Sequence, residues 1–197
     1  MVRKSLLMCV LMMILPLCAC RADGSTAPQE RALAIRADYL SADGCTAQVT
    51  LTADYGRRVY CYQGGVTANG QETVLTLTAP EEVAGVVARL KNGGSALEYD
   101  GAVVETGPLS DDGLTPLGAV PALLEAARSA FMDSSTLESV DGQNLLRVLC
   151  RDPALDPGQG QEFTLWFDPG SGALLQGELS LDGHRVITCQ FQQFTLL

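Results

Sequence analysis

The sequence predicts an α+β domain in which helices cover one face of a curved antiparallel sheet. Two segments of the 197-residue chain, 28–40 and 117–131, space their apolar residues at helical intervals. Most of the chain after residue 45 instead alternates apolar and polar residues, which is typical of strands. The links are short and no β-α-β alternation appears, so we expect antiparallel pairing. Because a long antiparallel sheet twists and curls, the mid-chain helix is expected to fill its concave side.

The N-terminus has the pattern of an export signal. Arg3 and Lys4 precede thirteen uncharged residues, 5–17, which is shorter than the ~20 apolar residues of a transmembrane helix. Cleavage before Cys20 leaves the small Ala19 at the cut, so residues 1–19 are predicted to be the signal peptide. An ordinary secretory signal is the alternative. A metal clamp is disfavoured because the distant His184 and remote cysteines supply no ligand spacing.

The four residues 17–20, "LCAC", resemble the lipobox of bacterial lipoproteins. The resemblance implies thioether lipidation of Cys20, cleavage before it, and acylation of the new N-terminus with chains such as palmitate. Residues 20–27 would then be a lipidated tether, and 28–197 a single domain on the extracytoplasmic face of the cell membrane. Several acyl chains anchor a protein firmly, at ~0.8 kcal/mol per buried CH₂.

The composition excludes some partners. Cleavage would leave 178 residues, and removal of Arg3 and Lys4 would change the formal charge from −10 to −12. Such an acidic body argues against nucleic acid and against lying flat on an anionic membrane. Cysteines 45, 61, 150 and 189 remain in the body. Export permits disulfides, but their spacing shows no compact framework, so buried free thiols are favoured.

The first third of the domain is predicted to be a helix followed by hairpins. The helix at 28–40 begins with Pro28 in its first turn and buries Ala32, Ile35, Tyr39 and Leu40. A hairpin follows, and central residues Tyr55 and Gly56 would place Leu51 opposite Tyr60 and Val49 opposite Tyr62. Cys45 and Cys61 would then point to opposite faces.

The middle of the chain continues this pattern. The segment 69–80 is a strand that places Thr73, Leu75 and Leu77 on one face. Pro80, Glu81 and Glu82 suit a single helical turn. Segment 86–101 could be a helix, but its "KNGG" turn favours a hairpin.

The clearest helix follows Thr115, its expected N-cap, with Pro116 at the first position. Its apolar face would consist of Leu117, Val120, Leu124, Ala127 and Phe131, and Pro121 is expected to kink or split it. The last third reads as four strands, at 144–150, 162–167, 173–181 and 185–194, joined by turn sequences such as "DPGSG".

Three segments resemble the LolA-like lipoprotein carrier superfamily: "TLTAPEEVAGVVARL", "LEYDGAVVETGPLSDDGLTPLGAVPALLEA" and "FTLWFDPGSGALLQGELSLDG". The resemblance covers about residues 28–197 and is strongest to a lipid-anchored branch of spore-forming bacteria that includes a germination lipoprotein. It implies an unclosed antiparallel half-barrel around helices, with an apolar cavity for acyl chains. A protein fixed by Cys20 cannot shuttle between membranes as true carriers do.

No catalytic signature accompanies this resemblance. His184 is expected in an exposed turn, and the acidic pairs 81–82 and 111–112 suit caps or solvated charge. Neither "SDDG" nor "DPGSG" has the ligand spacing of a calcium loop. We therefore expect a non-enzymatic protein without metal or cofactor.

Two functions remain in competition. The first is a module that binds a lipid, an acyl chain or a lipoprotein in the concave half-barrel. Its candidate pocket residues are Leu51, Leu75, Leu77, Leu97, Tyr99, Leu124, Phe131, Phe163 and Leu165. The same residues could instead close into a filled core. The second function is a membrane-tethered subunit that positions or activates a cell-envelope or spore-cortex enzyme, with exposed strand edges pairing with that partner or with a second copy in a homodimer.

Overall fold

The computed structural model describes residues 26–91, 94–107 and 114–197, so the predicted signal peptide and Cys20 lie outside it. Its helical elements are α2 (Thr26–Ser41), the short 3₁₀ turn η1 (Glu81–Val83) and α3 (Pro116–Ser129). The strands of the first half are β1 (Gly44–Asp54), β2 (Val59–Asn69), β3 (Glu72–Ala79), β4 (Val87–Lys91), β5 (Gly94–Tyr99) and β6 (Ala102–Gly107). Those of the second half are β7 (Met132–Val140), β8 (Gln143–Arg151), β9 (Gln161–Phe167), β10 (Leu174–Leu181) and β11 (His184–Leu196).

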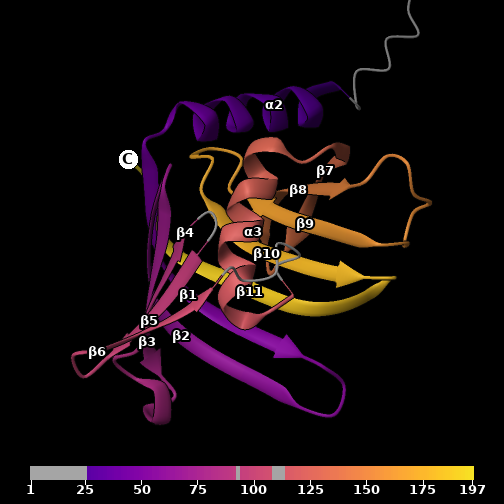
Figure 1. The fold of residues 1–197 in the computed structure, drawn as a ribbon. Coiled ribbons are helices and arrows are strands. Elements are labelled where there is room, and N and C mark those ends of the chain that lie inside the picture. The colour runs from indigo at the N-terminus through magenta and orange to yellow at the C-terminus, as the bar shows by residue number, and fades with distance from the viewer. Residues whose placement is uncertain (1–25, 92–93, 108–113) are drawn as a thin grey trace, which may run out of the picture.

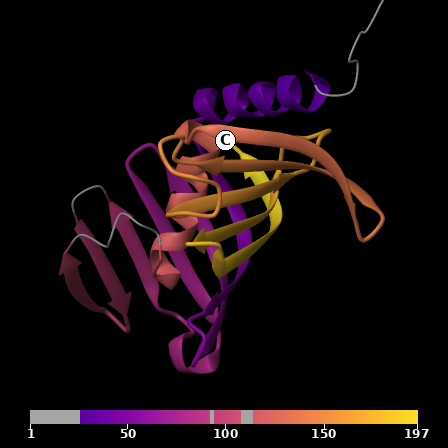
Figure 2. The ribbon, with the colours of Figure 1, turned by 90° about the vertical axis from the view of Figure 1, so that its right-hand side faces the viewer.

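All the strands of the described residues join one antiparallel sheet in the order β6-β5-β4-β3-β2-β1-β11-β10-β9-β8-β7. Two meanders therefore meet where β1 pairs with β11, and β6 and β7 are the edge strands of the sheet that the described residues form. The sheet curves around α3, while α2 lies across one end of the curve (Figures 1 and 2). No helix within the described ranges is long and apolar enough to cross a membrane.

Helix α2 confirms the predicted first element. Ala32, Ile35 and Tyr39 are buried, as their spacing predicts. The prediction for Leu40 is wrong, because this side chain is 56% exposed. Leu40 follows Tyr39 directly, and neighbouring helical residues point about 100° apart, so both cannot face the core.

The first hairpin forms, but its predicted register is wrong by two residues. Leu51 lies opposite Tyr62, and Val49 opposite Gly64. The reason is a longer loop: the Tyr55 N–H donates to the Arg58 carbonyl (3.0 Å), and Gly56 N–H to Asp54 Oδ1 (2.8 Å). A shift of two keeps every side chain on its predicted face.

The cysteines of this hairpin lie on the faces that the sequence predicts. Cys45 is buried and Cys61 is exposed, on opposite sides of the hairpin, and Cys150 and Cys189 are buried. All four are free. Burial is thus confirmed for three of the thiols but is wrong for Cys61, which lies on the convex face opposite Thr52.

The middle elements agree with their predictions. Thr73, Leu75 and Leu77 are buried on one face of β3, and η1 is a single turn. Segment 86–101 folds as the β4–β5 hairpin rather than as a helix. The four predicted strands of the last third correspond to β8, β9, β10 and β11.

Strand β7 was missed by the sequence reading, and Phe131 was wrongly assigned to the helix. Helix α3 ends at Ser129, and Phe131 is 52% exposed just before β7. The pattern of β7 is weak because Leu137 faces solvent and most of its neighbours are polar. The Asp141-Gly142 pair, both with positive φ, marks the β7–β8 turn.

Helix α3 begins as predicted and sits deep in the curve of the sheet. Thr115 Oγ1 accepts the Gly118 N–H (3.1 Å), and Pro116 is the first helical residue. The helix continues through Pro121 and is not split. Leu123 is fully buried against β10, where a Cβ at Gly177 would lie 2.7 Å from a Leu123 methyl carbon. Glycine at this position lets the helix approach the sheet closely.

Candidate functional site

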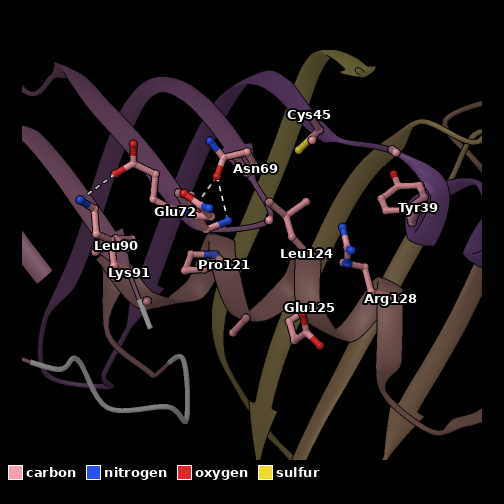
Figure 3. Close-up of a pocket in the computed structure, with 18 of the residues that line it drawn as sticks. Tyr39, Cys45, Asn69, Glu72, Leu90, Lys91, Pro121, Leu124, Glu125 and Arg128 are labelled. Atoms are coloured by element: carbon pink, nitrogen blue, oxygen red, sulfur yellow. Dashed lines mark hydrogen bonds and ion pairs between the residues drawn. The ribbon is translucent and has the colours of Figure 1, made fainter. Parts of the chain in front are cut away.

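An open pocket of about 520 Å³ lies between α3 and the N-terminal half of the sheet. One wall is the side of α3 that carries Pro121, Leu124 and Arg128 (Figure 3). The opposite wall is the concave face of β1 to β5 near the β2–β3 turn. Residues Tyr39 and Ala42, from the C-terminal end of α2 and the residue after it, close one end with Leu196 of β11.

Apolar side chains form the interior of this pocket. Cys45, Ala68 and Leu90 come from β1, β2 and β4 and are each buried. They face the pocket because alternate residues of a strand share one face. On the helix, Leu124 is 8% exposed and Ala122 is half-buried. The apolar interior of the pocket is therefore continuous with the main core, whereas polar and charged side chains form much of the rest of its lining.

The β2–β3 turn supplies a polar wall whose groups largely bind one another. Asn69 Oδ1 accepts the backbone N–H groups of Gln71 (2.8 Å) and Glu72 (2.9 Å). The carboxylate of Glu72 pairs with Lys91, with Nζ 3.5 Å from Oε2, and with Arg89, with Nη1 3.8 Å from Oε1 (Figure 3 shows the former). The negative charge of Glu72 is therefore neutralised by cations of the protein itself.

The other end of the pocket holds the C-terminus of α3, and Arg36 of α2 caps it. Arg36 donates through Nε to the Ala127 carbonyl (3.2 Å) and through Nη2 to the Ala130 carbonyl (2.6 Å). Nη2 also lies 3.5 Å from the Ala126 carbonyl. The last turn of a helix leaves its carbonyls without intrahelical partners. Arg36 supplies those partners and fixes α2 against α3.

Two buried groups beside this end have raised pKa values. Burial raises the pKa of the Cys45 thiol to about 11, against a smaller lowering by the positive charge of Arg128. Burial also raises the pKa of the Tyr39 phenol well above its ordinary value, although its hydroxyl donates to the Gly172 carbonyl (3.2 Å). Both groups are therefore neutral at physiological pH.

Of the nine residues that the sequence nominated, only Leu124 lines this pocket. Leu51, Leu75, Leu77 and Leu165 are buried in the hydrophobic core, and Leu97 and Phe163 are half-buried against it. Tyr99 and Phe131 are 56% and 52% exposed. Among the described residues, side chains thus fill the deep part of the concave face where these residues lie, and the pocket beside α3 lies toward its rim.

Sequence reasoning missed most of the lining because small and polar residues form it. Ala68, Ala122 and Gly118 leave the space empty by being small, and alternation alone does not distinguish them from core residues. A usable signal was present in the helix. Arg128 follows Leu124 by four residues and therefore lies on the apolar face.

Metal chemistry finds no support in the described ranges. They contain no group of three or more His, Cys, Asp or Glu side chains placed to hold a metal ion. His184 is exposed at the start of β11, as expected. Glu81 and Glu82 are exposed in η1, whereas Asp111 and Asp112 lie outside the described residues.

Comparison with known proteins gives matches in structure alone. Neither the models of known protein families nor the curated protein sequences contain a match to the chain. The structure of LprF from Mycobacterium bovis is 15% identical and has a TM-score of 0.50, over 87% of this chain and 94% of that one.

Two further solved structures match at lower TM-scores. A LolA superfamily protein from Nitrosomonas europaea is 13% identical, with a TM-score of 0.43 over 88% of this chain and 94% of that one. The complex of the CwlD amidase with the GerS lipoprotein from Clostridioides difficile is 10% identical, with a TM-score of 0.42 over 86% and 95%. These two likenesses carry no functional argument, and the identity to LprF restricts that likeness to the fold.

The predicted fold class is confirmed by these features together. The chain is an α+β protein whose single curved antiparallel sheet stays open at β6 and β7 and wraps around α3, with α2 at one end. It therefore has the unclosed antiparallel half-barrel around helices that the sequence predicts, and it shares this fold with LprF.

Proposed function

We propose that this protein is a lipid-anchored, extracytoplasmic binding protein that holds an apolar ligand in the pocket beside α3. The observation that carries this proposal is the open pocket of about 520 Å³, with Cys45, Ala68, Leu90 and Leu124 in its interior. A volume of roughly 300–1,000 Å³ is typical of small-molecule sites, and such sites combine apolar surface with a few polar groups that orient the ligand.

The pocket itself supports a binding role rather than catalysis. Its one thiol, Cys45, has a pKa raised to about 11 by burial, so the nucleophilic thiolate is scarce at neutral pH. Of its two carboxylates, Glu72 is paired with Lys91 and Arg89, and the exposed Glu125 accepts the Ser129 hydroxyl. These groups do not combine a nucleophile with a base, which acyl or glycosyl transfer would require.

A filled pocket provides the test of ligand binding. Ala122→Trp places a large side chain into the space from α3, whereas Leu33→Trp adds the same side chain at a position that is 53% exposed on α2. We expect a fluorescent acyl probe to bind the wild type and Leu33→Trp equally, and Ala122→Trp at least about tenfold more weakly. Equal binding by all three proteins would place the probe elsewhere and contradict the proposal.

The anchor is the second part of this proposal and rests on the lipobox-like "LCAC". We expect Cys20→Ser to release the protein from the salt-washed membrane fraction or to block its processing, with a matching loss of acyl mass. Cys18→Ser should change neither, because Cys18 leaves with the signal peptide. If Cys20→Ser leaves the membrane-bound fraction and the acylated mass unchanged, the anchor assignment is wrong.

A second candidate function, a partner subunit for an envelope enzyme, is favoured by the free edge at β6. Val103 and Val104 are 61% and 59% exposed and point to opposite faces of this edge strand. Unpaired edge strands with apolar side chains readily accept a further strand. A spore-cortex enzyme is the partner that the resemblance to the spore-forming branch implies, and a second copy is the other.

Photo-crosslinking from the edge tests this candidate. A benzophenone amino acid at Val103 should capture one defined envelope protein, and the purified pair should lose affinity when Val104 is replaced by Lys. The same photo-reactive residue at Leu33 is the control, because Leu33 is exposed on α2, which packs against β7 and β8 at the other end of the sheet. Crosslinks that are identical from both positions would contradict a partner role for β6.

A further inference from the structure

We propose that the pocket selects a single-chain amphiphile with an anionic head group, and that the guanidinium of Arg128 receives this head group. The inference rests on the proposed function, because it names the ligand class of the same pocket. The shared chemistry is a carboxylate or a phosphate at the end of one alkyl chain.

Arg128 is placed toward the pocket and is free to bind a ligand. Its side chain lies between Leu124 and Tyr39, on the side of α3 that faces Cys45 (Figure 3). Within the residues that the structure describes, no hydrogen bond or ion pair engages this guanidinium, which is half-buried. Since this guanidinium is half-buried and has no protein anion beside it, it is available to an anionic ligand, and a charge pair formed there is stronger than one in bulk water.

Capping of the helix does not account for Arg128. A cation in the last turn interacts favourably with the helix dipole, and that is the simplest alternative. However, Arg36 already donates to the carbonyls of Ala126, Ala127 and Ala130. The terminal carbonyls therefore have a cationic partner, and Arg128 extends away from them toward the sheet.

The nearby acids are already engaged elsewhere. Glu125, one turn before Arg128, is exposed and accepts the Ser129 hydroxyl through Oε1 (2.6 Å). Glu72 is paired with Lys91 and Arg89 at the opposite end of the pocket. Neither acid therefore pairs with Arg128. Its positive charge is left for a ligand, which favours a ligand that is anionic.

The shape of the pocket orients the rest of the ligand. Leu124 and Pro121 lie between Arg128 at one end and Leu90 at the other (Figure 3). A head group at Arg128 would therefore lead an alkyl chain along α3 toward Leu90. The volume of about 520 Å³ suits one chain. The planar guanidinium matches a carboxylate or phosphate in bidentate geometry.

The test is photo-labelling of the full chain reconstituted in phosphatidylcholine vesicles. Three probes carry the same diazirine-bearing alkyl chain and end in a carboxylate, a phosphate or a neutral hydroxyl. Labelled peptides are mapped by mass spectrometry. We expect the two anionic probes to label peptides from α3 and from the β2–β3 turn, and the stronger of the two identifies the head group.

Variants of Arg128 separate the head-group claim from pocket binding. Arg128→Gln should lower labelling by the preferred anionic probe about tenfold and leave labelling by the alcohol unchanged, whereas Arg128→Lys should retain part of it. Arg57→Gln, on the exposed β1–β2 loop, is the control and should behave as wild type. Equal labelling by all probes, unchanged in Arg128→Gln, would overturn the inference but leave the binding function intact. No labelling of the pocket by any probe would overturn both.

Discussion

At the residue scale, a few polar side chains determine how the helices sit on the sheet. Arg31 donates through Nε to the Pro169 carbonyl (2.6 Å) and through Nη2 to the Gly170 carbonyl (3.0 Å), which fixes α2 to the β9–β10 turn. Arg36 fixes the same helix to the end of α3. Both arginines donate to backbone carbonyls. Such bonds depend on where the partner segment lies and not on which side chains it carries.

Arg36→Ala tests the importance of this contact. The carbonyls of Ala127 and Ala130 would lose a charge-assisted partner in a partly buried place, so we expect the free energy of unfolding to fall by about 2–3 kcal/mol. Urea denaturation measures this loss as a lower midpoint with an unchanged m-value. Arg57→Ala, on an exposed loop, should change stability by less than about 0.5 kcal/mol. A loss for Arg36→Ala as small as that of Arg57→Ala would show that the cap is not important.

Cys189 should make stability fall at alkaline pH. Burial raises its pKa from 9.0 to about 12 in the folded protein. Its neutral form is therefore favoured by folding, so this contribution is complete below pH 9 and is lost as the pH rises toward 12. We expect Cys189→Val to flatten the decline in the free energy of unfolding between pH 8 and pH 11. Cys61→Val, at an exposed thiol, should leave the decline as in the wild type, and identical slopes in both variants would refute the assignment.

At the element scale, hairpins and helix starts were predictable because their signals are local. Thr115 with Pro116 located the start of α3, and turn pairs such as Asp182-Gly183 located the hairpins of the last third. Two local errors have physical causes. The β1–β2 register depended on loop hydrogen bonds at Tyr55 that the alternation does not encode. Strand β7 lies at an edge, where burial no longer imposes an apolar pattern.

The seating of α3 depends on Gly177 and is open to a direct test. Gly177→Ala would place a Cβ 2.7 Å and 2.8 Å from the two Leu123 methyl carbons, so we expect a loss of about 1–3 kcal/mol in unfolding free energy. Gly70→Ala, whose Cβ would meet nothing within 4 Å, is the control. Leu123→Ala should lower the unfolding free energy by less in the Gly177→Ala background than in the wild type. A double-mutant cycle measures this difference. Strict additivity would contradict the contact.

At the scale of the whole molecule, the order of the elements made the fold class predictable. Among the described strands, every pairing joins two strands that are consecutive in sequence, except that of β1 with β11, so almost every pairing follows from a local turn. The pocket could not be predicted in the same way. Its space depends on where small residues such as Ala68 and Ala122 coincide across α3 and the sheet, which is a property of the tertiary packing.

The proposed function requires that the half-barrel holds an apolar ligand instead of closing into a filled core. Its most direct test is lipid extracted with organic solvent from the purified protein and identified by mass spectrometry, beside a native mass spectrum of the intact chain. We predict one bound amphiphile per protein in the wild type and loss of it in Ala122→Trp. A wild-type protein that is empty, under conditions in which a known lipid carrier retains its lipid, would contradict the account.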